Sequence, residues 1–125
     1  MRFISTRTHG LLDYPVGILM LLAPTLWGIG DTPRVILMVV GVGILLMSAL
    51  TDYPLGVYRK IRFEAHRVID ILTAVLLIGA PWMFGFSAVD SVRNAFLGFG
   101  TFILLTSFMT STAGAESPEI RHRHA

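Results

Sequence analysis

The chain lacks cysteine altogether and carries little charge. None of its 125 residues is a cysteine, and only 14% are Asp, Glu, Lys or Arg. The first absence excludes disulfides, thiolate metal sites and thiol nucleophiles. The scarcity of charge, together with 54% hydrophobic residues and a mean hydropathy of +0.69, is far from the composition of a water-soluble domain. The formal net charge of +2 is too small and too scattered to indicate nucleic acid as a partner. The composition predicts a single domain whose solvent is lipid.

The hydrophobic residues are concentrated in four long stretches. Each is close to the roughly 20 residues that a helix needs to cross a hydrocarbon core of about 30 Å. Backbone amides exposed to lipid must be paired internally, and the stretches lack the alternating polarity of barrel strands, so all four are expected to be helices. The sequence predicts an all-α, integral membrane four-helix bundle with these spans: Leu11–Ile29, Val35–Leu50, Val68–Phe86 and Ala95–Thr110.

The basic residues predict an orientation for this bundle. Only Arg34 and Arg93 lie in the two short connections between paired spans, where Thr32-Pro33 and Ser87 with Asp90 are expected to cap the second and fourth helices. Under the positive-inside rule, both termini and the central loop are expected in the cytoplasm. The remaining eight basic residues support this assignment: Arg2, Arg7, Arg59, Lys60, Arg62, Arg67, Arg121 and Arg123.

The two halves of the chain repeat each other when the sequence is shifted so that His9 falls on His66. Each half contributes an even number of spans, so the copies are expected to be parallel and equivalent residues to lie at equal depth. Pro24 and Pro81 are expected to end their helices, and the paired glycines to allow close helix packing. The same shift superposes several further pairs: Asp13 on Asp70, Ala23-Pro24 on Ala80-Pro81, Gly28 on Gly85, Gly41 on Gly98, and Gly43 on Gly100.

This pattern divides the chain into five segments. They are a cytoplasmic N-terminus (1–8), repeat 1 (9–56), a cytoplasmic loop (57–65), repeat 2 (66–112) and a disordered cytoplasmic tail (113–125).

A short motif near the end of the first span in each repeat resembles a known family. Ala80-Pro81-Trp82 is similar to the Ser-Pro-Trp triplet that gives its name to the SPW repeat family, whereas Ala23-Pro24-Thr25 keeps only the proline. The resemblance covers nearly the whole chain outside the tails. It implies a small multi-pass protein of the bacterial inner membrane, and it implies no particular activity.

Two His-x-x-x-Asp pairs are the candidate functional residues. They are His9 with Asp13 and His66 with Asp70, each pair on one helix face one turn apart. The two pairs could hold a metal ion, or the two histidines could be the axial ligands of a haem. Ionisable groups in a membrane also mark proton or ion paths.

The simplest interpretation is that these groups meet water at the interface and pair locally, Asp70 with Arg67 and Asp13 with His9, His66 or a loop arginine. Glu64 would then pair with Arg62 or Arg67.

No nucleophile–base pair stands out, so we expect no catalysis and no cofactor, and we expect a structural or interaction component of the membrane. Its expected partners are the lipid bilayer and a second copy or another membrane protein. Two alternatives stay open. One is a metal- or haem-binding redox protein using His9, His66, Asp13 and Asp70, and the other is a small proton or ion channel or transporter subunit.

Overall fold

The computed structural model describes residues 4–52 and 55–110, and it consists almost entirely of four helices. Its elements in chain order are α1 (Thr6–Leu26), α2 (Asp31–Leu50), β1 (Thr51–Asp52), β2 (Ile61–Arg62), α3 (Phe63–Met83) and α4 (Asp90–Met109). The two strands are a short parallel pair that joins Thr51 to Ile61 and Asp52 to Arg62. The predicted all-α four-helix bundle is confirmed. The tail 113–125, which we expected to be disordered, lies outside the described residues.

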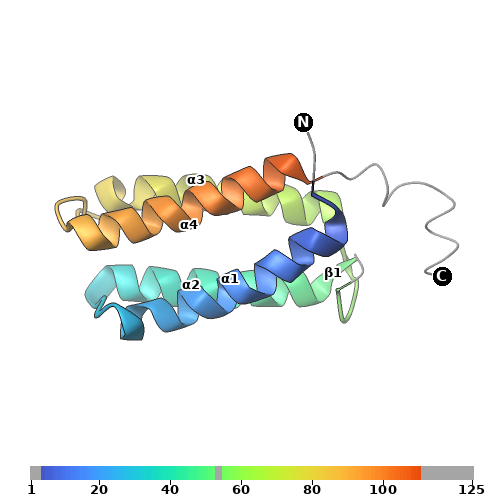
Figure 1. Cartoon of the computed structure of the whole chain (residues 1–125), viewed down its shortest axis with the longest axis horizontal. Helices are drawn as coiled ribbons and strands as arrows, with labels where there is room; N and C mark the ends of the chain where they lie inside the picture. Colours follow the sequence, from blue (N-terminus) through green and yellow to red (C-terminus); the bar gives the residue numbers. More distant parts are fainter. Residues whose placement is uncertain (1–3, 53–54, 111–125) are drawn as a thin grey trace, which may run out of the picture.

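The helices form two hairpins that lie side by side (Figure 1). α1 packs along α2 and α3 along α4, whereas contacts between the hairpins are sparse. The beginnings of α1 and α3 and the ends of α2 and α4 lie at one end of the bundle, here called the cluster end, and the two short connections lie at the other, the loop end (Figure 1). At the cluster end, the Ile4 amide donates to the Met109 carbonyl at 3.0 Å.

Pro24 and Pro81 lie in the last turns of α1 and α3, and a glycine follows the end of each helix. α1 ends at Leu26 and Gly28 follows with a φ of +65°, while α3 ends at Met83 and Gly85 follows with a φ of +78°. The next amide in each case donates back to the proline carbonyl, at 2.9 Å and 2.8 Å. This is the Schellman arrangement, which needs a left-handed residue that glycine adopts without strain.

The starts of α2 and α4 differ from the prediction. α2 begins at Asp31, and its first turn is closed by the Arg34 amide donating to the carbonyl of Gly30. α4 begins at Asp90 in the same way, with the Arg93 amide donating to the Val89 carbonyl. Neither helix has a side-chain cap, so Thr32 and Ser87 are not caps.

The register between the two hairpins is also corrected by the structure. α1 and α3 correspond in the register that places His9 on His66, here called the histidine register. α2 and α4 instead correspond with Asp31 on Asp90, here called the shifted register, because the second connection is longer than the first.

In the shifted register, Gly41 corresponds to Gly100 and not to Gly98. A Cβ at Gly41 would lie 2.9 Å from the Gly17 carbonyl oxygen, and one at Gly100 would lie 2.9 Å from the Ala74 carbonyl oxygen. These two glycines allow the close packing that we expected, whereas Gly43 and Gly98 face open space.

The outer surface of the bundle is apolar, as a lipid environment requires. Leu22, Val39, Leu72 and Leu105 are each more than half exposed. By length and composition, α1, α2 and α4 can each cross a membrane. α3 is as long as α1 and carries Glu64, Arg67 and Asp70 near its start. The large exposed apolar area, with three helices of spanning length, makes this a small membrane protein.

Candidate functional site

The two His-x-x-x-Asp pairs meet in one buried cluster between the hairpins. His9 and Asp13 come from the first two turns of α1, and His66 and Asp70 from the first two turns of α3. Both histidines are fully buried, and the aspartates are 8% and 5% exposed. One ligand atom from each residue lies within 4.8 Å of the other three. We call these four residues the His/Asp cluster.

One carboxylate oxygen of each aspartate in the cluster faces both imidazoles. The Asp13 Oδ2 atom lies 3.2 Å from Nε2 of His9 and 2.9 Å from Nε2 of His66. The Asp70 Oδ2 atom lies 3.0 Å and 3.1 Å from the same two nitrogens. Nitrogen and oxygen atoms therefore alternate around a ring. Two of its four edges link side chains of different hairpins, so the ring connects halves of the molecule that otherwise touch little.

The other ring nitrogen of each histidine contacts a threonine hydroxyl at the end of a neighbouring helix. His66 Nδ1 lies 2.6 Å from Thr51 Oγ1, and His9 Nδ1 lies 2.8 Å from Thr110 Oγ1. Each hydroxyl also donates its proton to a backbone carbonyl one turn earlier, Met47 for Thr51 and Thr106 for Thr110. A hydroxyl has one proton and a carbonyl can only accept. The hydroxyl oxygen must therefore accept from the imidazole, and both Nδ1 atoms carry a proton.

This assignment determines what the Nε2 atoms can do. A neutral imidazole with a proton on Nδ1 has a lone pair on Nε2. In the ring that lone pair would face two carboxylate oxygens and repel both. Two arrangements remove this repulsion. Either each imidazole takes a second proton, on its Nε2 atom, or one divalent cation binds all four atoms. Two protons and one divalent ion supply the same charge against two carboxylates.

The spacing of the four donor atoms suits a transition-metal ion. Bonds of about 2.0–2.1 Å to four ligands give neighbouring donors about 2.9 Å apart in a square and about 3.4 Å apart in a tetrahedron. The ring edges of 2.9–3.2 Å lie between these values. A haem fits less well, because its porphyrin must lie between the two axial nitrogens, and here the aspartate oxygens occupy that space.

Comparison with known proteins identifies the family. The profile of the SPW repeat domain matches residues 7–110, which include the whole His/Asp cluster and nearly all of the four helices. The chain belongs to the SPW repeat family. No curated protein and no solved structure matches it significantly.

The sequence interpretation of locally paired, hydrated ionisable groups holds only in part at the cluster: Asp13 does pair with His9 and His66, but the groups are buried away from water. His9 and His66 are fully buried, and Asp70 contacts both imidazoles. Arg67, its expected partner, has a buried Nε atom without a hydrogen bond among the described residues. The exposed pair of Arg62 and Glu64 does form, at 3.6 Å. Packing explains the difference, because the two hairpins bring the first turns of α1 and α3 face to face rather than toward water.

Several residues of the site were missed from the sequence. Thr51 and Thr110 hold the imidazoles, and the Ser48 hydroxyl donates to Asp13 Oδ2 at 3.3 Å. The signal was present as Ser-x-x-Thr at the end of each hairpin, Ser48 to Thr51 and Ser107 to Thr110, but these residues superpose only in the shifted register. An alignment in the histidine register does not reveal them.

Phe63 was also missed, and it closes the cluster on one side. Its ring stacks on His66 with a centroid separation of 5.9 Å and meets His9 edge-on at 5.3 Å. The first hairpin has Thr6 at the corresponding position, so repeat symmetry gave no indication of it.

Proposed function

We propose that this SPW repeat protein binds one divalent late first-row transition-metal ion, of the class of Zn²⁺, Cu²⁺ and Ni²⁺, between its two hairpins. The observation that carries the proposal is the convergence of four donor atoms from both hairpins, with both Nδ1 atoms already committed to threonine hydroxyls. Metal-binding histidines characteristically donate their other N–H to a fixed acceptor, which fixes the ring orientation.

The donor set supports this class of ion. Imidazole nitrogen suits Zn²⁺, Cu²⁺ and Ni²⁺, whereas Mg²⁺ and Ca²⁺ prefer oxygen ligands throughout. Two carboxylates balance the charge of a divalent ion, so the complex is neutral within the membrane. Neutrality matters because an uncompensated charge there is costly.

The role we propose is structural and not catalytic. Four protein donors complete a four-coordinate site, whereas catalytic sites keep one position open for water or substrate. The bound ion would join hairpins whose other mutual contacts are sparse. The protein would thus act as a structural or interaction component of the membrane, with the ion holding its fold.

Metal analysis of purified protein tests this. The protein would be purified in mild detergent without a histidine tag, exposed to Zn²⁺, freed of excess ion and measured by mass spectrometry of the elements. We expect one ion per chain, and its loss in His9→Ala and in His66→Ala. The matched control is His122→Ala with His124→Ala, which removes the other two histidines of the chain. A wild-type protein without stoichiometric metal, or equal binding by all variants, would overturn the proposal.

The proposal also covers the orientation of the protein in the membrane and the crossing of the membrane by α3. The cluster end faces the cytoplasm of a bacterial inner membrane, all four helices cross, and both termini are cytoplasmic. Arg7, Arg59, Lys60 and Arg62 at the cluster end support this under the positive-inside rule.

Because the natural chain has no cysteine, single cysteines can report this topology. A membrane-impermeant thiol reagent added to intact cells would label Gly30→Cys and spare Lys60→Cys. Labelling of Lys60→Cys would indicate the opposite orientation. Labelling of neither variant would show that the loop end does not reach the outside.

A further inference from the structure

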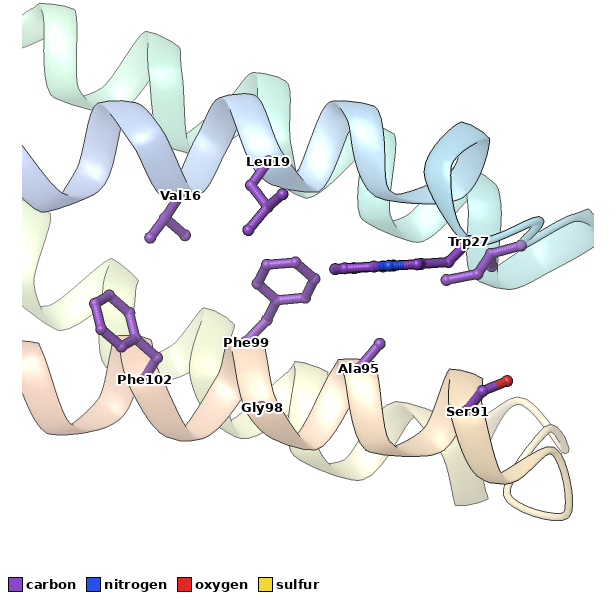
Figure 2. Close-up of a pocket in the computed structure, with 9 residues that line it drawn as sticks. Val16, Leu19, Trp27, Ser91, Ala95, Gly98, Phe99 and Phe102 are labelled. Carbon is purple, nitrogen blue, oxygen red and sulfur yellow. The ribbon is translucent and has the colours of Figure 1, made fainter.

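An apolar groove lies between α1 and α4 and runs from the loop end of the bundle toward its middle. Its volume is about 740 Å³, within the range of about 300–1,000 Å³ typical of small-molecule sites. In Figure 2, Val16 and Leu19 of α1 face Phe102 and Phe99 of α4 across it, with the indole of Trp27 beside Phe99. The Trp27 and Phe99 ring centroids are 6.4 Å apart.

The second hairpin makes room for this groove with two small residues. Ala95 and Gly98 of α4 line it, and in the shifted register their counterparts on α2 are Ile36 and Val39. A Cβ at Gly98 would meet nothing within 4 Å. The space is therefore a particular feature of the α1/α4 side and not a general consequence of the repeat.

The groove has the depth of one membrane leaflet. It runs from Val16 on α1 to Trp27, just after the end of that helix, and from Ser91 to Phe102 on α4. Each run of about eleven residues advances about 16 Å at 1.5 Å per residue. That is about half of a hydrocarbon core of roughly 30 Å. Trp27, at the outer boundary of the groove, is the residue type that membrane interfaces favour.

We propose that this groove binds one acyl chain of a phospholipid from the leaflet at the loop end. The lining is almost wholly apolar, with Ser91 at the boundary where the chain would meet its glycerol backbone. The apolar lining and the length of one leaflet favour an acyl chain of the surrounding bilayer as the occupant, and a helix of a second copy is the alternative that the experiment below distinguishes.

The two tryptophans of the chain allow a matched test. Trp27 lines the groove, whereas Trp82 is on α3 outside it, and they are 56% and 58% exposed. Trp82→Phe leaves Trp27 as the only indole, and Trp27→Phe leaves Trp82. Each variant in detergent micelles is titrated with a phosphatidylcholine brominated on one acyl chain, which quenches indole fluorescence on contact. We expect quenching of Trp27 to saturate near one lipid per protein, and quenching of Trp82 to rise without saturation.

A plugging variant makes the test specific to the groove. In the Trp82→Phe background, Gly98→Leu fills the open space and is expected to abolish the saturable quenching. Gly43→Leu, also at a glycine with open space around it, is the control and should retain it. Equal, unsaturated quenching of both tryptophans would overturn the proposal, as would saturable quenching that persists in Gly98→Leu. Protection of Trp27 from quenching, with a dimer mass by light scattering that Gly98→Leu abolishes, would assign the groove to a second copy instead.

Discussion

The Nε2 atom of His9 lies 3.0 Å from Oδ2 of Asp70, a residue 61 positions further along the chain. This contact joins the first turn of α1 to the second turn of α3, and thereby one hairpin to the other. Both groups are buried, so neither can exchange the partner for water at low cost. The fold and the candidate site therefore depend on the same few atoms.

His9→Ala should destabilise the protein strongly. The substitution leaves two buried carboxylates facing a single imidazole, and removing one member of a buried ion pair typically costs about 3–5 kcal/mol. We expect unfolding at a lower dodecyl sulfate fraction, measured by circular dichroism in mixed micelles.

A double-mutant cycle can assign this loss to the contact between hairpins. His9→Ala combined with Asp70→Asn should cost clearly less than the sum of the two single substitutions, because both remove the same interaction. His9→Ala with Glu64→Gln is the control and should be additive, since Glu64 pairs with Arg62 at an exposed position. Strict additivity in both pairs would argue against the contact.

Thr51→Val should weaken metal binding while leaving all four ligands in place. The hydroxyl accepts from His66 Nδ1, and loss of such a supporting partner typically costs about 10- to 100-fold in metal affinity. Isothermal titration with Zn²⁺ measures the effect. Thr51→Ser keeps the hydroxyl and should restore affinity, while Thr101→Val, at an exposed position on α4, should have no effect. Unchanged affinity in Thr51→Val would contradict the assignment of the Nδ1 proton.

Much of the fold follows from the sequence because its signals are local. Apolar length predicted four helices, and Pro24 and Pro81 predicted where α1 and α3 end. Helix starts were less predictable, since Gly30 and Val89 begin α2 and α4 through backbone carbonyls, which leave no signature in residue type.

The site was only half predictable for a different reason. His9, Asp13, His66 and Asp70 were visible because they repeat, but their burial depends on how two hairpins meet, which is a property of packing between distant segments. Thr51 and Thr110 were hidden by the longer second connection, which moves α4 out of the histidine register.

Metal affinity should fall as the pH is lowered. The two Nε2 atoms take either a proton each or one divalent ion, so protons and metal compete for the same lone pairs, and binding should release up to two protons. Zn²⁺ titrations in buffers of different ionisation enthalpy give the number of protons released. A proton release of zero at neutral and mildly acidic pH would mean that the ion does not bind at the imidazoles.

Gly41→Val should separate α1 from α2, and Gly43→Val should not. A Cβ at Gly41 would lie 2.9 Å from the Gly17 carbonyl oxygen and 3.2 Å from the backbone nitrogen of Leu21, neither of which can move without displacing α1. Overpacking of this kind typically costs about 1–3 kcal/mol. Gly43 lies on the same helix and has open space around it, so valine there tests only helix propensity.

The same comparison in the second hairpin distinguishes the two possible registers. The shifted register makes Gly100 the counterpart of Gly41, because a Cβ at Gly100 would lie 2.9 Å from the Ala74 carbonyl oxygen, whereas Gly98 faces open space. Gly100→Val should therefore lower the dodecyl sulfate fraction at which the helices unfold, and Gly98→Val should leave it near the wild-type value. If Gly98→Val were the more damaging of the two, the hairpins would instead correspond in the histidine register along their whole length, and Thr110 would not be in position to hold His9.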